Sequence, residues 1–479
     1  MLCLTGRENT TADLARRLER GFELAPGCLQ EVRLDALETP DADLFDLVTR
    51  WGRRLVVCCR SPRQGGFRQL PEEERVRLLF QAAEAGAGVL DADFPGDLEF
   101  FRTVRPGEEC RLMASVHDFN GVPANLETTL ARIREFEPDL VKVAVTVEDA
   151  ADLLRLRLLA EHAGLPGVWV GMGYAGLLSR VRYTHFHSEW TYVCADEGGS
   201  TAPGQLTLGE ATEMGLPDGS RAPFLALVGG PSVRFSPGPR AYNRLFRALG
   251  APYAYVPVLT DKAAETFALL QDLGAVGASV TMPHKQEALE CARPDELALR
   301  VGAANTVRFS PEGMSCTNTD LEGILLPLRY SLAATPGTPP TALVLGAGGA
   351  ARAAGAVCED LGWDVVFAAR DLGKAARKLG PRTRCVPWGE RAEVEAAVLI
   401  NATPSSGPDS PWPDNTPLRK RVVFDLALGP EPCRLLRQAW TEGAVAIPAV
   451  EMWLHQGAAQ VRWLTGLDLD AETLREYLP

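Results

Sequence analysis

The chain has 479 residues, too many for one hydrophobic core, and its length predicts two or three domains. Hydrophobic residues make up 46% and charged residues 23%, ordinary globular values that argue against disorder. A formal net charge of −13 argues against a nucleic-acid-binding surface. No apolar run approaches about 18 residues and no basic-then-apolar leader is found, so we expect a cytoplasmic protein without a membrane partner.

Eleven cysteines and six histidines are scattered through the chain. The cysteines form no Cys-x-x-Cys pair and the histidines show no ligand spacing, so no metal is expected. In the absence of a secretory context, the cysteines are expected to be free, buried thiols in a reducing compartment.

Apolar strands alternate with amphipathic segments over roughly the first 210 residues. Eight strands are expected, at 1–6, 30–37, 54–60, 88–94, 111–119, 140–146, 167–173 and 190–196. Intervening segments such as 12–20, 71–85, 126–136 and 148–163 have lengths that suit crossover helices. Eight such units predict a (β/α)8 TIM barrel, with an open doubly wound sheet as the alternative.

Lys142 lies in the middle of the apolar run at 140–146. Burial in a strand favours a neutral amine, which can attack a ketone and form a Schiff base. His117 ends the preceding expected strand, where a general base would stand. Taken singly, either residue is compatible with a structural role, but their pairing on adjacent strands favours chemistry.

Other polar residues occur near the C-terminal ends of the expected strands, where barrel enzymes gather their reactive groups. The arginines among them suit a carboxylate, since a guanidinium group binds it through two parallel hydrogen bonds. Each arginine alone is also compatible with a surface salt bridge. The candidates are Glu31, Arg33, Arg60, Arg180, Thr201 and Gln205.

The first part resembles the type I 3-dehydroquinate dehydratases, in motif order and over its whole length. The matching runs are Glu31-Val-Arg33-Leu-Asp35, Cys59-Arg60, Ser115-Val-His117, Val141-Lys142, Met172-Gly173, Ser179-Arg180 and Ala202-Pro-Gly-Gln205. The resemblance implies that Lys142 forms an imine with 3-dehydroquinate and that His117 transfers the protons. It also implies that Arg180 holds the carboxylate, and that the polyol side is lined by Glu31, Arg33, Arg60, Thr201 and Gln205.

Three positions depart from that family's pattern. Gln64 stands where many relatives have Glu, Asp93 where Glu is usual, and Thr201 where Ser is expected. Each keeps a hydrogen-bonding group, so altered turnover is expected rather than loss of activity. If the usual Glu orients the histidine, Asp93 would reach His117 less well.

A Gly-, Pro- and Asp-rich stretch at 211–222 predicts a short linker. A strand, a glycine turn and an alanine-rich helix then follow one another in the run 341–352, an order typical of dinucleotide-binding domains. Arg370 and Lys374 after the next strand favour the 2′-phosphate of NADP, although the neighbouring Asp371 is more typical of NAD enzymes.

Lys285 and Asp320 form a second candidate pair. Lys285 follows a Pro-directed turn, and Asp320 is expected as an exposed carboxylate at the end of an extended segment. A lysine and an aspartate facing one substrate can supply the proton that a carbonyl needs on reduction. As isolated features, both are also typical of surface loops.

From residue 223 onward the chain resembles shikimate dehydrogenase. The matching runs include Gly302-Ala-Ala-Asn-Thr306, Asn318-Thr-Asp320, Asn401-Ala-Thr-Pro404 and Glu451-Met452. The resemblance implies proton transfer by Lys285 and Asp320, and substrate contacts from Ser236, Thr281, Asn305 and Gln456, with Gly238 where a second serine is usual. For NADP it implies Gly346, Ala347, Gly348, Gly349, Ala350, Arg370, Lys374, Thr403, Leu426, Ala449 and Met452.

Together these resemblances imply a fused shikimate-pathway enzyme that dehydrates 3-dehydroquinate and then reduces 3-dehydroshikimate to shikimate with NADPH. The expected domains are a barrel at 1–210, a linker at 211–222, a substrate domain at 223–335 completed by 450–479, and a Rossmann domain at 336–449. The two alternatives are a quinate or shikimate dehydrogenase that uses NAD, and a non-catalytic metabolite sensor.

Overall fold

The computed structural model describes residues 1–104, 106–216, 218–332, 340–380, 383–404, 410–414, 416–419, 421–429 and 431–478. The chain divides into two compact units, Met1–Ala275 and Val276–Pro479. Each unit is described by itself. Among the described helices, none is long and apolar enough to cross a membrane.

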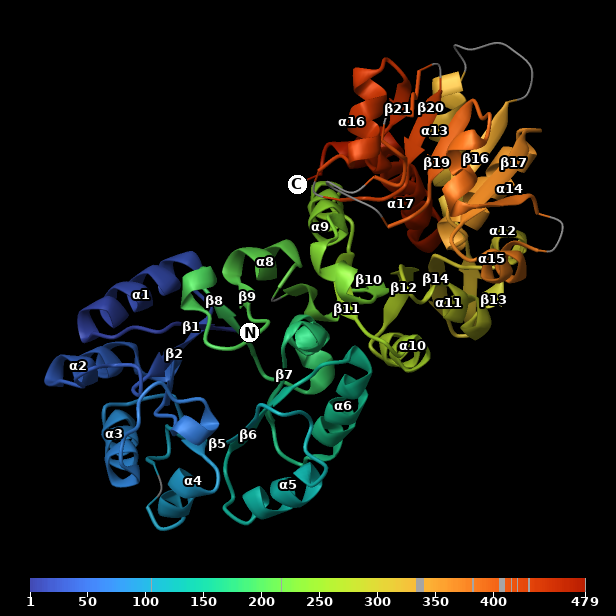
Figure 1. Ribbon diagram of the computed structural model, residues 1–479. Coiled ribbons are helices and arrows are strands. Elements are labelled where there is room, and N and C mark those ends of the chain that lie inside the picture. Colours follow the sequence, from blue (N-terminus) through green and yellow to red (C-terminus); the bar gives the residue numbers. More distant parts are fainter. Residues whose placement is uncertain are drawn as a thin grey trace. The chain divides into compact units, whose positions relative to one another are not determined.

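A curved parallel sheet forms the first part of the first unit (Figure 1). Neighbouring strands are consecutive in the chain from β1 to β7, and β8 pairs with β1. A bridge between Gly167 at the start of β7 and Ser188 just before β8 joins the two ends of the circle. The expected barrel is therefore confirmed. Its strands are β1 (Leu2–Thr5), β2 (Leu29–Arg33), β3 (Leu55–Cys58), β4 (Val89–Asp93), β5 (Arg111–Asp118), β6 (Leu140–Thr146), β7 (Gly167–Met172) and β8 (Thr191–Cys194), followed by β9 (Leu206–Thr207).

Amphipathic helices connect these strands. Polar caps fix the starts of several helices: the Thr10 side chain accepts the Asp13 amide before α1, and Asp41 accepts the Leu44 amide before α2. The apolar side chains of the helices pack against the strands, while the barrel interior is filled by residues such as Met113, Val168 and Trp190. The helices are α1 (Thr11–Leu24), α2 (Ala42–Trp51), α3 (Glu72–Glu84), α4 (Gly96–Phe101), α5 (Leu126–Arg134), α6 (Leu153–His162) and α7 (Leu177–Val181).

The stretch expected as a short linker, 211–222, includes the end of helix α8 (Leu208–Glu213) and a 3-10 turn at Asp218–Arg221. Thr207 and Glu210 form a reciprocal capping box that starts α8, a signal visible in the sequence as Thr-x-x-Glu. Beyond it, the first unit continues with β10 (Phe224–Gly229), α9 (Gly238–Ala248), β11 (Ala254–Leu259) and α10 (Ala263–Asp272).

The barrel is joined to this continuation by side-chain contacts as well as by the chain. Asp149, after β6, accepts hydrogen bonds from Thr260 Oγ1 and from the Asp261 amide, both at 2.7 Å. Arg157 on α6 pairs with Asp272 at the end of α10 at 2.6 Å. The two parts are thus packed together, which differs from two domains held only by a tether.

The second unit begins with the strands β12 (Ala275–Val280), β13 (Arg293–Pro294), β14 (Thr306–Ser310) and β15 (Gly313–Thr317). The β12, β14 and β15 strands are antiparallel neighbours, and β13 lies parallel to β15. The accompanying helices are α11 (Lys285–Cys291), α12 (Glu296–Val301) and α13 (Asp320–Leu332).

A six-stranded parallel sheet follows, in the order β18-β17-β16-β19-β20-β21. This is the strand order of a classical dinucleotide-binding fold, with the reversal between β16 and β19. Leu343 and Leu345 of β16 face one apolar cluster, and Val344 faces the other. Both faces of β16 are therefore buried, which explains why the sequence of this strand is continuously apolar. The strands are β16 (Thr341–Leu345), β17 (Asp364–Ala369), β18 (Cys385–Pro387), β19 (Val398–Asn401), β20 (Val422–Asp425) and β21 (Val445–Ile447); the helices are α14 (Gly349–Asp360), α15 (Leu372–Leu379), α16 (Arg434–Thr441), α17 (Ala449–Thr465) and α18 (Ala471–Arg475).

Candidate active sites

Lys142 lies inside the barrel on β6, with 6% of its surface exposed. Its Nζ is 3.2 Å from Asp91 Oδ2 and 3.6 Å from Glu31 Oε1, and it lies 4.3 Å from the centre of the Tyr192 ring. The expected burial is confirmed. Two carboxylates also contact or approach the amine, which the sequence analysis did not predict.

Asp91 connects the lysine to the rest of the barrel interior. Its carboxylate also binds the Arg60 guanidinium and accepts the Ser115 hydroxyl. Burial acts to raise the pKa of Asp91, but Arg60, Lys142 and the Ser115 hydrogen bond hold it below the ordinary value. Sequence reasoning missed this residue, although its spacing of two from Asp93 on β4 places both side chains on one face of the strand.

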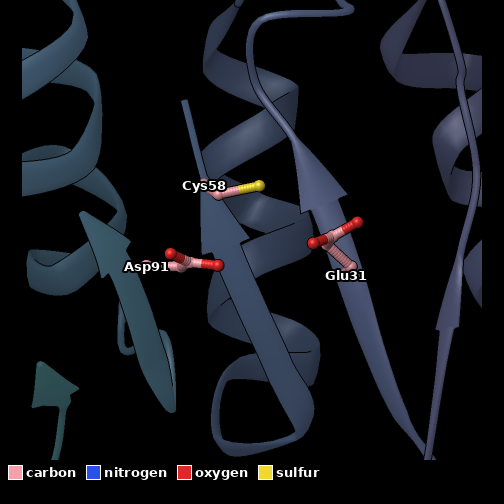
Figure 2. A group of neighbouring side chains, drawn as sticks. All are labelled: Glu31, Cys58 and Asp91. Carbon is pink, nitrogen blue, oxygen red and sulfur yellow. The ribbon is translucent and has the colours of Figure 1, made fainter. Parts of the chain in front are cut away.

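Glu31, Cys58 and Asp91 bring their ligand atoms within 4.8 Å of one another from three neighbouring strands (Figure 2). Asp91 is already neutralised by Arg60 and Lys142. Burial and the Glu31 charge raise the pKa of the Cys58 thiol well above its ordinary value. The chemistry of this group therefore fits an internal ion-pair network better than a metal site.

His117 is half-buried near the C-terminal end of β5. Gln64 Oε1 accepts the His117 backbone amide at 2.7 Å and lies 3.0 Å from His117 Nδ1. The Gln64 amide nitrogen donates to the Phe94 carbonyl at 3.2 Å. These two backbone partners fix which end of the amide is oxygen, so His117 Nδ1 must carry the hydrogen and Nε2 is the free base.

The charge state of His117 follows from its surroundings. Burial lowers the pKa of His117 well below the ordinary value, and the positive charges of Arg60, Lys142 and Arg33 lower it further. The ring is therefore neutral at neutral pH. Asp93 pairs with Arg60 at 2.9 Å and accepts the Ser61 amide, whereas the side chain that contacts His117 Nδ1 is that of Gln64, in keeping with the expectation that Asp93 reaches this histidine poorly.

The three candidate arginines of the barrel differ in their partners. Arg33 pairs with Asp35 at 2.8 Å, and Arg60 pairs with Asp91 and Asp93. Arg180 on α7 is 2% exposed, has no carboxylate partner among the described residues, and donates only a long 3.4 Å bond to the Pro203 carbonyl. Burial lowers the pKa of Arg180 to about 10, still far above neutral pH. Arg180 is thus a cation available to an anionic ligand.

Thr201 and Gln205 lie together after β8. The Thr201 amide donates to Gln205 Oε1 at 2.8 Å, and the Thr201 hydroxyl is hydrogen-bonded to the Thr5 hydroxyl at 2.9 Å. The Pro203 carbonyl between them is the acceptor for Arg180. This loop therefore brings two polar side chains close to the unpaired guanidinium.

In the second unit, Lys285 Nζ is 2.6 Å from Asp320 Oδ2. The lysine side chain is 20% exposed but the aspartate only 3%, so the expected exposed carboxylate is wrong. Asn305 explains the burial, because its amide donates to Asp320 Oδ1 at 2.7 Å and lies 3.4 Å from Gln456 Oε1. The structure thus brings four of the expected residues into one polar cluster.

The glycine turn after β16 lies against this cluster. Gly346 has a positive φ of 114°, and a side chain there would come within 3.1 Å of the Ala402 carbonyl. A side chain at Gly349 would come within 3.8 Å of Lys285 Cδ, whereas Gly348 has open space. Ala347 in the turn and Ala350 in the first turn of α14 are half-buried. The twelve-residue helix α14 begins here, so the turn fits a pyrophosphate at its N-terminus.

Arg370 and Lys374 are exposed after β17, and neither has an ion-pair partner in the described parts of the chain. The Asp371 carboxylate accepts the Lys374 amide at 2.8 Å and so caps α15. This carboxylate is occupied by the helix start, which leaves two unpaired cations for a phosphate.

The remaining candidates have diverse positions. Thr403 donates its hydroxyl to Asn401 Oδ1 at 2.6 Å beside Gly346, and the Leu426 amide donates to the Asn401 carbonyl. Ala449 and Met452 are buried in the first turn of α17, and the Thr281 carbonyl accepts the His284 amide. In the first unit, Ser236 Oγ accepts the Gly238 amide at 3.2 Å.

Fold and sites define a two-part α/β protein, a barrel with a buried lysine followed by a dinucleotide-binding dehydrogenase fold. Residues 7–215 match the family model of type I 3-dehydroquinase, and residues 228–307 match that of the shikimate dehydrogenase substrate binding domain. The NADP(+) shikimate dehydrogenase of Synechococcus sp. (strain JA-3-3Ab) is 37% identical over 276 residues, which cover 53% of this chain and 92% of that protein.

A chloroplastic bifunctional 3-dehydroquinate dehydratase/shikimate dehydrogenase of Arabidopsis thaliana is 29% identical over 93% of this chain and 78% of its own length. The solved dehydroquinate dehydratase and shikimate dehydrogenase from S. pombe AroM aligns with a TM-score of 0.44 and 21% identity, over 100% of this chain and 98% of that one. The chain belongs to the shikimate dehydrogenase family, fused to an N-terminal type I 3-dehydroquinase.

Proposed function

We propose that the barrel dehydrates 3-dehydroquinate to 3-dehydroshikimate through an imine on Lys142. The amine adds to the ketone and water leaves; a proton is then removed beside the imine carbon, the neighbouring hydroxyl departs as water, and hydrolysis frees the product. Once protonated, the imine carries a positive charge, and Asp91 and Glu31 lie where they can stabilise it.

His117 is the proposed base for the proton transfer. Its Nε2 is unprotonated because Gln64 fixes the hydrogen on Nδ1, and burial with three nearby cations keeps the ring neutral. After it accepts the proton, the imidazolium can return it to the departing hydroxyl. Arg180 is proposed to bind the substrate carboxylate, since its guanidinium is buried beside the Thr201–Gln205 loop and lacks an acidic partner within the described residues.

Glu31, Arg33, Arg60, Thr201 and Gln205 are proposed to line the polyol side of this substrate. Arg33 and Arg60 are engaged by Asp35 and by Asp91 with Asp93. We therefore assign them to shaping the site more than to binding charge, whereas Thr201 and Gln205 offer hydrogen bonds from the loop beside Arg180.

The second part is proposed to reduce 3-dehydroshikimate to shikimate with NADPH. The bound nucleotide supplies the hydride. Lys285 donates the proton to the carbonyl oxygen, and Asp320, held by Asn305, keeps the lysine amine oriented. Thr281, Gln456, Ser236 and Gly238 are proposed substrate contacts.

The cofactor site fits NADP better than NAD. The glycines at 346, 348 and 349 and the start of α14 suit the pyrophosphate, with Ala347, Ala350 and Thr403 alongside. Arg370 and Lys374 suit the 2′-phosphate, because Asp371 caps α15. Leu426, Ala449 and Met452 are proposed to border the nicotinamide. The alternative, a quinate dehydrogenase that uses NAD, was suggested in part by Asp371. This carboxylate instead caps α15, which weakens that suggestion.

We propose the domain limits expected from the sequence, and two features of the fold support them. The barrel strands end before residue 210, and α17 packs on α13, as expected if residues 450–479 complete the substrate domain at 223–335. The linker would be 211–222 and the Rossmann domain 336–449.

A buried lysine on β6 and a neutral histidine on the neighbouring strand β5 carry the dehydratase proposal. It is tested by incubating the full chain with 3-dehydroquinate and borohydride, followed by mass spectrometry. We expect one reduced adduct on Lys142. An unmodified chain, or an adduct on another lysine, would refute the imine mechanism.

A further inference from the structure

Arg182 lies at the end of α7, two residues after Arg180, and is 1% exposed. Its guanidinium reaches out of the barrel into the dehydrogenase part. Nη1 donates to the Ala222 carbonyl at 2.6 Å, and the group lies 4.5 Å from the centre of the buried Phe224 ring at the start of β10. A barrel residue is thus anchored on the segment that leads into β10 and on the first residue of that strand.

The helix that carries Arg180 depends on such anchors. It has five residues, and an isolated helix of that length is unstable because nucleation is unfavourable. On the barrel side, Ser179 Oγ binds the Gly171 amide at 2.8 Å and the Gly176 carbonyl at 2.7 Å. Within the described part of the chain, the Arg180 side chain adds only the long bond to Pro203.

A second anchor precedes the helix in the 3-10 turn Tyr174–Gly176. The Tyr174 hydroxyl donates to the Val233 carbonyl at 3.4 Å, and the Arg234 guanidinium lies 5.2 Å from the centre of its ring. The α7 helix also packs on β11. Both flanks of the Arg180 segment are therefore held by residues of the dehydrogenase part.

We propose that Arg182 is a positioning residue for the dehydratase, through which the dehydrogenase part holds Arg180 in its substrate-binding place. The inference rests on the proposed role of Arg180 in binding the substrate carboxylate. It extends that function by making a residue outside the barrel, at the start of β10, part of what determines affinity for dehydroquinate.

The test uses Arg182→Met in the full chain, which keeps an extended side chain and removes the hydrogen bond to the Ala222 carbonyl. Loss of a buried charged hydrogen bond should raise KM for dehydroquinate by about tenfold, with kcat within about twofold. Replacing a buried cation by an apolar side chain of similar volume need not lower stability, so Tm separates mispositioning from unfolding. Arg182→Lys, which can still donate to Ala222, should restore most of the affinity.

The matched control is Arg157→Met, which removes another arginine that links the barrel to the dehydrogenase part, on α6 instead of α7. Its KM should equal that of the parent. A parental KM in Arg182→Met, or an equal rise in Arg157→Met, would overturn the inference.

Two further variants allow the proposal to be tested even if Arg182→Met does not fold, and separate it from the proposed role of Arg180. If Arg182→Met does not fold, Tyr174→Phe replaces it, with an expected rise in KM of about threefold from one long hydrogen bond; an unchanged KM would then count against the proposal. Arg180→Gln tests the underlying function separately. If Arg180→Gln raises KM and Arg182→Met does not, the positioning role fails and the carboxylate role stands.

Discussion

Replacing Gln64 by Glu places a carboxylate where the structure has a neutral amide, 3.0 Å from His117 Nδ1. An anion in contact with an imidazole stabilises its charged form and raises its pKa by about 1 to 3, equivalent to about 1.4–4 kcal/mol. In the parent, burial and three cations hold the pKa of His117 well below its ordinary value, so the base remains unprotonated as the pH falls through about 6.5. The acid limb of dehydratase kcat/KM should therefore move to higher pH in Gln64→Glu, by about one to three pH units.

The assay is kcat/KM for dehydration measured from pH 4.5 to 9 in both proteins. Reduction of 3-dehydroshikimate by the same preparations is the internal control, since the substitution lies far from Lys285 in sequence and in another compact unit. The new carboxylate also faces the Phe94 carbonyl in place of a donor, which should cost about 1–3 kcal/mol of the free energy of unfolding. An acid limb that stays in place, or moves to lower pH, would refute the assignment of the base and its tautomer.

Lys142→Ala should abolish dehydration and leave reduction at the parental rate, measured on each substrate separately; parental dehydration would contradict the imine mechanism. Asp320→Asn keeps the bond from Asn305 but removes the charge beside Lys285, and should lower kcat for reduction by about 10²–10⁴ without affecting dehydration. Arg370→Gln should raise KM for NADPH by about tenfold and leave KM for NADH unchanged, because only the former carries a 2′-phosphate. Asp371→Asn, which retains a good helix cap, should leave the NADPH to NADH preference as it is; a large change would show that Asp371 contacts the nucleotide.

The amino-acid sequence was sufficient to predict the barrel and the dinucleotide-binding sheet. Strands buried on both faces are continuous apolar runs, as in β6 and β16, and short runs of this kind separated by helical segments leave few other arrangements. The glycine turn was equally visible, since Gly346 adopts a conformation that other residues rarely reach.

Electrostatic partners were harder to foresee. Whether Lys142 faces apolar groups or carboxylates depends on side chains from β2 and β4, more than 50 residues away in the case of Asp91. The burial of Asp320 likewise depends on Asn305, and the contact between Gln64 and His117 on a loop that no periodicity describes. These pairings are set by how strands and loops meet in space, which a single sequence does not encode locally.

The bond of Asp149 to Thr260 and the Asp261 amide has a practical consequence for handling this enzyme. A protease that cuts the chain at 214–216 would separate the barrel from the rest of the polypeptide. The two fragments would still be held together by these hydrogen bonds and by the ion pair between Arg157 and Asp272. They should co-elute on gel filtration and separate only in denaturant, so a single peak after digestion is no sign that the chain is intact.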